Sequence, residues 1–217
     1  MTRHLVVFVK APRLGTVKTR LARTIGDPEA WLFYRRLTHA VLRRLAGPWQ
    51  LWLAVTPDRF AREGRFWPPH VPRRPQGTGN IGRRMLRPVR ELPPGPVVIV
   101  GSDIPELDRH HVAAAFRALG SHDAVFGPAR DGGYWLVGLR RRPSRAHPFA
   151  RAVRWSTKYA LADTLAALGP NHSHALLETL SDVDTIVEYG AWLAHKRAET
   201  PNPRPFGERT ATRSGAG

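Results

Sequence analysis

Short apolar runs alternate along the chain with stretches of helical period. The apolar runs predict β-strands at residues 5–9, 50–56, 97–100, 123–126 and 134–139. The stretches of helical period predict α-helices at residues 29–45, 81–91, 109–119 and 159–168, and a last strand and helix share residues 176–195. Alternation of this kind is typical of βαβ units. The pattern therefore predicts an α/β domain with a mixed, mostly parallel sheet and helices on both faces.

One domain accounts for nearly the whole chain. A chain of 217 residues is long enough to bury a core of its own. We expect this domain at residues 1–197. From about Glu199 onward the composition turns to Pro, Arg, Thr, Ser and Gly, with almost nothing to bury. A segment of that kind predicts a disordered basic tail at residues 198–217.

The composition excludes several classes of protein. The chain contains no cysteine, so it has neither a disulfide framework nor a zinc site with cysteine ligands. The first apolar run ends at Lys10 and is too short for a signal segment or a membrane span. We therefore expect a soluble, cytoplasmic protein without a membrane partner, and the pattern indicates no particular oligomeric state.

The net charge of +17 is unusually high. No acidic residue precedes Asp27, and none lies between Glu63 and Glu91 or between Asp131 and Asp163. These basic segments predict a cleft that attracts phosphate, although arginines scattered over a solvated surface would give the same total. A nucleic-acid-binding module is a further alternative. Carboxylates at strand ends argue against it, because without a metal ion they repel a phosphate backbone.

The loop after the first strand is rich in cations. It carries Lys10, Arg13, Lys18 and Arg20 around Gly15. Glycine lets the backbone approach a phosphate group, and Lys and Arg neutralise its charge. The loop is not a Walker A loop, because Val17 stands where glycine must precede the lysine. We expect this loop to bind phosphate.

Carboxylates follow two later segments, at the edge of the sheet where ligands bind in open α/β folds. Asp103 comes directly after the strand at 97–100, and Asp182 and Asp184 lie near the last helix. Alternate residues of an extended segment face the same way, so Asp182 and Asp184 are expected to point together. Carboxylate oxygens and bound phosphates are usual ligands of Mg²⁺. We therefore expect a two-carboxylate magnesium or manganese site that includes Asp103.

These motifs, in this order, resemble a family of small bacterial GT-A-like transferases related to the nucleotide-diphospho-sugar transferases. The resemblance covers about residues 4–195. It rests on residues 8–22, 76–79, 82–85, 101–105, 131–139, 155–157 and 182–185. Some members are identified as arsenosugar-biosynthesis glycosyltransferases. The layout is also similar to 2-phospho-L-lactate guanylyltransferase and molybdenum-cofactor guanylyltransferase.

The resemblance implies a single GT-A, Rossmann-like domain and assigns roles to particular residues. Phosphate contacts would come from Lys10, Gly15, Lys18 and Arg20, and base contacts from Gln76, Gly77 and Gly79. Asp103 and Asp184 would bind the metal ion. Residues 131–134 and 155–157 would border the acceptor, and Asp131, Tyr134 and Trp155 would contact the bound substrates.

Two functions of one fold follow from these features. In the first, Lys18, Arg20 and Asp103 serve a metal-dependent nucleotidyl transfer from a nucleoside triphosphate to a small phosphorylated acceptor, with release of pyrophosphate. The alternative is glycosyl transfer from a nucleotide-diphospho-sugar. The cation-rich loop favours the triphosphate.

Overall fold

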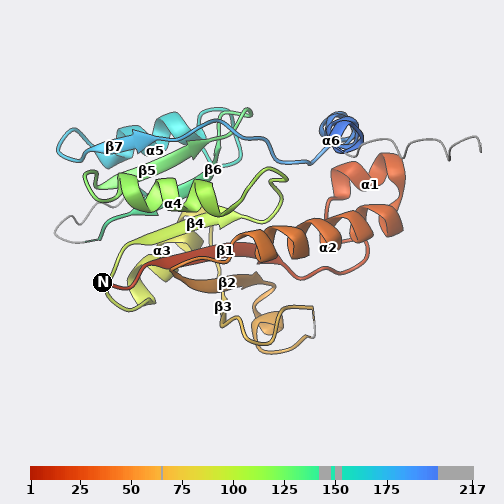
Figure 1. Ribbon diagram of the computed structural model, residues 1–217, viewed down its shortest axis with the longest axis horizontal. Helices are drawn as coiled ribbons and strands as arrows, with labels where there is room; N and C mark the ends of the chain where they lie inside the picture. Colours follow the sequence, from red (N-terminus) through yellow and green to blue (C-terminus); the bar gives the residue numbers. More distant parts are fainter. Residues whose placement is uncertain (65, 142–147, 150–152, 200–217) are drawn as a thin grey trace, which may run out of the picture.

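The computed structural model describes residues 1–64, 66–141, 148–149 and 153–199, so nearly all of the predicted tail at 198–217 lies outside the described residues. Within them, seven strands form one sheet (Figure 1). The strands are β1 (His4–Lys10), β2 (Gln50–Thr56), β3 (Arg73–Pro75), β4 (Val97–Gly101), β5 (Ala124–Pro128), β6 (Tyr134–Leu139) and β7 (His174–Leu176).

The sheet is mixed and mostly parallel. Its order is β3-β2-β1-β4-β6-β5-β7, and β6 runs antiparallel to both β4 and β5. The remaining neighbours pair in parallel. Because β6 is antiparallel to both of its neighbours, β5 points the same way as β1 and β4. The carboxyl ends of β1, β4 and β5 therefore lie at the same edge of the sheet.

Helices cover both faces of the sheet. The helices are α1 (Thr19–Ile25), α2 (Asp27–Arg44), α3 (Ile81–Glu91), α4 (Arg109–Ala118), α5 (Ala160–Leu168) and α6 (Ile186–Glu199), and a short 3-10 turn, η1, spans Asp58–Ala61. Alternate residues of β1 face opposite layers. Leu5 and Val7 lie in the core that α1, α2, α4 and α6 help to cover, and Val6 lies in the core under α3 and α5. The predicted fold class is confirmed.

The sequence pattern misses one strand. Residues 73–75, in a stretch that predicts an irregular connection, form β3 at the edge of the sheet beside β2. Pro75 can occupy this position because an edge strand leaves its outer hydrogen-bonding groups unpaired. The pattern also gives no sign that β6 runs antiparallel.

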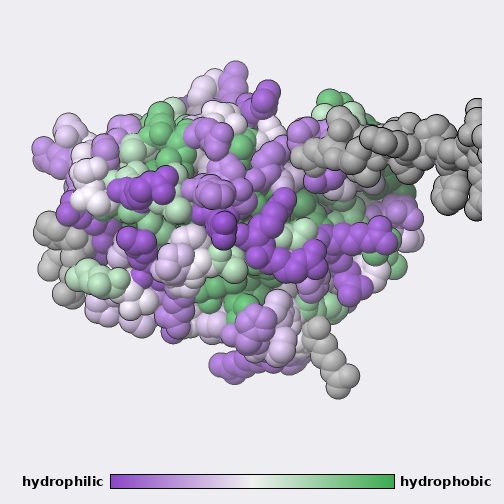
Figure 2. Space-filling model, viewed as in Figure 1, coloured by the Kyte–Doolittle hydropathy of each residue, from purple (hydrophilic) through white to green (hydrophobic). Residues whose placement is uncertain are grey.

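The surface of the described residues is largely hydrophilic on the face shown in Figure 2, where hydrophobic areas are small and separated. No helix in the described part of the chain combines the length and the apolar character needed to cross a membrane.

Candidate functional site

Four loops meet at the edge where β1, β4 and β5 end (Figure 1). They are the cationic loop between β1 and α1, the loop after β4 with Asp103, the turn between β5 and β6 with Asp131, and the segment between β7 and α6. Sequence positions far apart are thus brought to one place, as expected for the ligand-binding edge of an open α/β sheet.

Lys18 lies between two of the carboxylates. Its side chain is only 4% exposed, and its Nζ donates to Asp103 Oδ2 at 2.8 Å and lies 3.5 Å from Asp184 Oδ1. Burial alone would lower the pKa of Lys18, but the charge and hydrogen bond of Asp103, helped by Asp184 and Asp182, raise it above its usual value. The lysine therefore remains an ammonium group. Asp103 and Asp184 converge on this one cation.

The backbone of the cationic loop is held from α2. The hydroxyl group of Tyr34 accepts a hydrogen bond from Lys10 N and donates one to Lys10 O, both at 2.9 Å. Trp31 Nε1 donates to Pro12 O at 2.7 Å. At its other end, Lys18 adopts the left-handed conformation, with φ 48° and ψ 43°. A left-handed non-glycine residue costs about 1–3 kcal/mol and persists only where its surroundings hold it. The ion pairs of Lys18 are such surroundings.

Two adjoining cavities open at this edge. The first, about 480 Å³, is called the cationic cavity here and is lined by Lys10, Thr16, Val17, Lys18, Thr19, Arg20, Asp103, Asp131, Ser156 and Asp184. The second, about 230 Å³, is called the aromatic cavity and is lined by Ile81, Met85, Gly101, Asp103, Ile104, Ala129, Asp131, Gly133, Tyr134, Trp135, Trp155, Ser156, Thr157, Ala160 and Asp182. Asp103, Asp131 and Ser156 line both, so the two cavities share a boundary.

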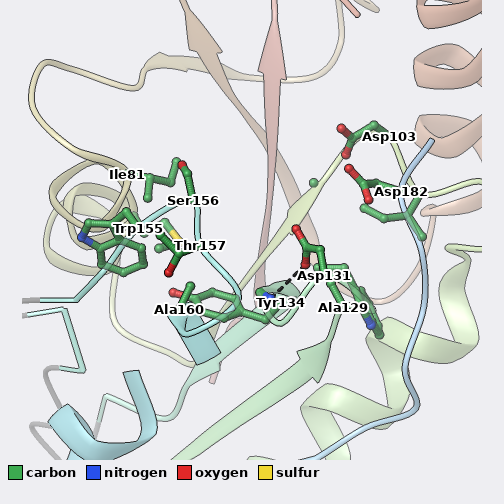
Figure 3. A pocket seen from close by; sticks show the side chains of 15 residues that line it. Ile81, Asp103, Ala129, Asp131, Tyr134, Trp155, Ser156, Thr157, Ala160 and Asp182 are labelled. Carbon is green, nitrogen blue, oxygen red and sulfur yellow. Dashed lines mark hydrogen bonds between the residues drawn. The ribbon is translucent and has the colours of Figure 1, made fainter. Parts of the chain in front are cut away.

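The aromatic cavity has two different walls (Figure 3). Asp103, Asp131 and Asp182 lie along one side, and Ile81, Trp155 and Thr157 lie on the other. No lysine or arginine is among the described residues that line it.

A network of local contacts positions Trp155. Gly82 lies directly under its ring, because a Cβ atom at residue 82 would stand 2.4 Å from Trp155 Cζ2. The preceding residue, Arg154, forms a two-point contact with Asp163 of α5, in which Nε and Nη2 each donate at 2.8 Å. Ser156 follows with φ 60°, which turns the chain toward the cavity boundary. The loop is therefore anchored to both α3 and α5.

Asp182 and Asp184 do not lie in the same cavity, contrary to the expectation from their alternating positions. Asp182 lines the aromatic cavity and Asp184 the cationic one. Burial, and then the charge of Asp103, raise the pKa of Asp182 to about 6. Arg20 instead pairs with Asp184, at 3.2 Å from Nη1 to Oδ2. The carboxylate that shares Lys18 with Asp103 is thus Asp184.

The predicted base-binding residues lie outside both cavities. Gln76 is buried, and its Nε2 donates to Val9 O at 3.2 Å and Ala54 O at 2.9 Å. Gly77 donates its backbone N–H to Asp58 Oδ1, and Gly79 has φ +100°. The contacts of Gln76 fix the turn to β1 and β2, and that of Gly77 fixes it to η1. Base binding by these residues stays a prediction. Gly15 also lies outside the cavities, with a φ of +71° that favours glycine.

The donor set suits a hard divalent cation. Carboxylate oxygens are the ligands that Mg²⁺ and Mn²⁺ prefer, and the ammonium group of Lys18 shows that a cation is stable between Asp103 and Asp184. In the part of the chain that the structure describes, no three histidine or carboxylate side chains gather closely enough to hold an ion. An ion at this position would need further oxygen ligands, and bound phosphates can supply them.

Sequence reasoning missed Tyr34, which holds the backbone of the cationic loop. Tyr34 belongs to the apolar face of α2, and only its polar tip distinguishes it from a core residue. Met85 and Ser156 belong to segments on which the resemblance rests, and both line cavities at the site. Ser156 lies in the segment 155–157 that the resemblance places beside the acceptor, whereas the resemblance gives Met85 no role.

The chain matches one family model, over residues 39–157, which is more than half of its length. The family is described as "Uncharacterized protein conserved in bacteria (DUF2064)". The matched range includes Asp103, Asp131, Tyr134 and Trp155, whereas the cationic loop and Asp184 fall outside it. Among curated proteins, none matches the sequence.

Solved structures show the same fold. The chain resembles a candidate nucleotide-diphospho-sugar transferase from Desulfovibrio desulfuricans G20, with a TM-score of 0.75 and 29% identity over 85% of this chain and 84% of that chain. CMP:2-keto-3-deoxy-manno-octonic acid synthetase complexed with CTP matches with a TM-score of 0.58 and 11% identity, over 92% of this chain and all of the other. At that identity the likeness shows the fold alone.

A third structure contains a metal ion. It is that of Rv0371c from Mycobacterium tuberculosis H37Rv in complex with manganese, with a TM-score of 0.53 and 16% identity over 89% of this chain and 99% of that chain. The likeness again concerns the fold. Together these structures confirm the resemblance to GT-A-like nucleotidyltransferases and nucleotide-diphospho-sugar transferases.

Proposed function

The chain belongs to the DUF2064 family of bacterial proteins, and from its site we propose that it is a metal-dependent nucleotidyltransferase. In this proposal a nucleoside triphosphate binds with its phosphates in the cationic cavity. A small acceptor binds in the aromatic cavity, and the nucleotidyl group passes between them at their shared boundary.

The convergence of Lys18, Asp103 and Asp184 beside the cationic cavity carries the proposal. Lys10, Lys18 and Arg20 face a volume of about 480 Å³ together with three carboxylates, of which Asp103 and Asp184 would hold the metal ion. Such a volume can hold a phosphate chain. Cations held in place before the reaction stabilise charge where it develops, and here that charge develops on the departing pyrophosphate. We assign this role to Lys18 and Arg20.

Asp103 and Asp184 would hold the magnesium or manganese ion together with phosphate oxygens. A bound ion of this kind neutralises phosphate charge and orients the phosphate groups. Asp103 also lines the aromatic cavity, so it lies where the two substrates meet. At that boundary an oxygen atom of the acceptor attacks the α-phosphorus, and the bond to the pyrophosphate oxygen breaks as the new bond forms.

The acceptor would be bordered by Asp131, Tyr134 and Trp155. The aromatic ring of Trp155 offers a flat apolar surface, and Asp131 accepts hydrogen bonds from hydroxyl or amino groups. The phosphorylated acceptor expected from the sequence gains no support from this wall, because its described residues include no lysine or arginine.

Glycosyl transfer from a nucleotide-diphospho-sugar is the second candidate. It is favoured by the 29% identity to a candidate nucleotide-diphospho-sugar transferase. The number of cations in the phosphate-side loop favours the triphosphate, since a diphosphate carries less charge to neutralise.

A competition titration distinguishes the two reactions. Common nucleoside triphosphates and the matching diphosphosugars are titrated against the protein with Mg²⁺ present, followed by pyrophosphate as competitor. We expect a triphosphate to bind more tightly than its diphosphosugar, and pyrophosphate to displace it. A diphosphosugar that binds tenfold more tightly than every triphosphate, a difference of about 1.4 kcal/mol, would instead establish sugar transfer as the better assignment.

A further inference from the structure

The cation position between Asp103 and Asp184 is filled by the protein itself. Lys18 Nζ lies 2.8 Å from Asp103 Oδ2 and 3.5 Å from Asp184 Oδ1, with the lysine side chain almost fully buried. An ion bound to the same oxygens would lie at about 2.1 Å from them, and so in the space that this ammonium group holds. Two cations cannot share that space, since they repel each other and lack a second set of ligands.

Resting on the proposed function, we propose that Lys18 excludes free divalent metal from the Asp103–Asp184 pair and yields this position only to a metal ion that arrives with phosphate groups. Lys18 thereby determines the order of binding: the metal ion and the phosphate chain bind together. The phosphates supply what Lys18 loses, because its ammonium group exchanges a carboxylate partner for a phosphate oxygen in the adjoining cationic cavity.

Charge balance supports this exchange. A free ion would have to take Asp103 and Asp184 from Lys18 without bringing an anion to replace them, which is costly. A metal ion that arrives with phosphates brings negative charge for Lys18 in the same step. Lys18 lines the cationic cavity, so its four-carbon side chain needs only a rotamer change to reach a group bound there.

Arg20 offers a contrast within the same loop. It also pairs with Asp184, at 3.2 Å, but its side chain is 72% exposed. The structure shows no contact of Arg20 with Asp103 among the described ion pairs. If positive charge alone excluded the free metal ion, Arg20 would contribute to the exclusion. If the exclusion comes from occupying the space between Asp103 and Asp184, Lys18 alone would produce it.

The test measures bound manganese by equilibrium dialysis of the full chain, without reference to activity. Wild type, Lys18→Met and Arg20→Met are dialysed against MnCl₂ alone and against MnCl₂ with inorganic pyrophosphate, a probe that is independent of the base. With MnCl₂ alone, Lys18→Met should bind manganese about tenfold or more tightly than wild type, because the competing cation is gone. Arg20→Met should resemble wild type. Adding Asp103→Asn to Lys18→Met should abolish the gain.

The outcomes separate this inference from the function on which it rests. Wild type that binds manganese alone as tightly as it does with pyrophosphate would overturn the role of Lys18 and leave the metal site intact. Equal gains in Lys18→Met and Arg20→Met, or no gain in Lys18→Met, would overturn it as well. Wild type that retains no manganese even with pyrophosphate would instead refute the proposed metal-dependent reaction. The comparison within wild type needs no variant, and Lys18→Gln replaces Lys18→Met if the latter does not fold.

Discussion

The local environment of each carboxylate, more than its place in a motif, decides what it does at this site. Asp184 is half-buried and forms ion pairs with both Lys18 and Arg20. Asp182 lies two residues earlier in the aromatic cavity, where burial and the charge of Asp103 disfavour ionisation. The two aspartates lie two positions apart in the sequence, but their surroundings differ.

Asp182→Asn should therefore stabilise the protein at neutral pH. The folded protein raises the pKa of Asp182 from 3.8 to about 6, so it holds this proton more tightly than the unfolded chain does. The stability that Asp182 gives at low pH is lost as the pH rises from about 4 to 6, and above that range its ionised carboxylate is a constant penalty. After allowance for solvent screening, removing it should gain about 1–2 kcal/mol at pH 7.5.

Urea unfolding of wild type and Asp182→Asn at pH 4 and pH 7.5 checks this prediction. The gain should appear at pH 7.5 and nearly vanish at pH 4, where the wild-type carboxyl group is already protonated when folded. An equal gain in stability at pH 4 and pH 7.5 would mean that the ionised carboxylate of Asp182 does not cause the gain.

Sequence reasoning located Lys18, Asp103 and Asp184 because residues that follow parallel strands share one edge of the sheet. It did not predict that Lys18 binds the two carboxylates directly, because the family resemblance assigns this lysine to phosphate groups. Gln76 makes contacts that its motif does not predict. Its position in a Gly-rich turn suggests that it binds a ligand. The hydrogen bonds from its side-chain amide to Val9 O and Ala54 O depend on tertiary packing that the sequence does not reveal.

At the scale of elements, the aromatic cavity depends on how closely α3 approaches the loop at Trp155. Gly82 permits that approach, because any side chain at this position would overlap the ring. The adjacent hydrogen bonds between Arg154 and Asp163 prevent the loop from simply moving away. A small change on α3 therefore affects the cavity wall directly.

Gly82→Ala should displace the Trp155 ring. Its new Cβ atom would start 2.4 Å from Trp155 Cζ2, well inside contact distance. The measurement is the indole N–H signal of Trp155 in NMR spectra, assigned by its loss in Trp155→Phe. Pyrophosphate binding should change by no more than about twofold, a shift below roughly 0.5 kcal/mol, because the cationic cavity does not include Trp155.

Gly190→Ala is the matched control on α6. A Cβ atom there would meet nothing within 4 Å, so the substitution should leave the Trp155 signal in place. It should raise stability by about 0.5–1 kcal/mol, since alanine is favoured over glycine within a helix. An unmoved Trp155 signal in Gly82→Ala would show that the helix, and not the ring, gives way.

Most helices and strands were predictable because their hydrophobic patterns are long. The features that were not predicted are a very short strand, β3, and the antiparallel pairing of β6. The β1 and β4 runs are apolar on both faces, as a central strand requires. β3 has three residues and ends in proline, so local pattern gives no signal for it. The direction of β6 is set by the tight turn after β5, whose Asp131–Gly133 contact closes it, and a run of apolar residues cannot show that.

On the scale of the whole molecule, the net charge of +17 contrasts with the carboxylates gathered at the site. Three arginines and one glutamate lie in residues 200–217, which contribute little to the total. The domain boundary near residue 197 stays a prediction. α6 reaches Glu199, so a chain that ends there keeps every described element.

A chain truncated after Glu199 should fold and bind as the full chain does. We expect its unfolding midpoint to lie within about 2 °C of the full chain, equivalent to less than roughly 1 kcal/mol for a domain of this size. Pyrophosphate affinity should be nearly unchanged at physiological salt, where distant charges are screened. Scanning calorimetry measures the unfolding midpoint, and equilibrium dialysis measures the pyrophosphate affinity. A larger loss of stability would mean that residues 200–217 pack against the domain.

The partners of Lys18 and Arg20 have a consequence for the order in which the protein forms during synthesis. Asp103 lies 85 residues after Lys18, and Asp184 lies 164 residues after Arg20. Contacts that close such long loops cost chain entropy and form late in folding. At a ribosomal rate of about 5–20 residues per second, the loop at residues 10–20 waits several seconds or more for its last carboxylate. A nascent chain shorter than 184 residues thus carries these cations without one of their acidic partners, and ligand binding should be the last property that refolding protein regains.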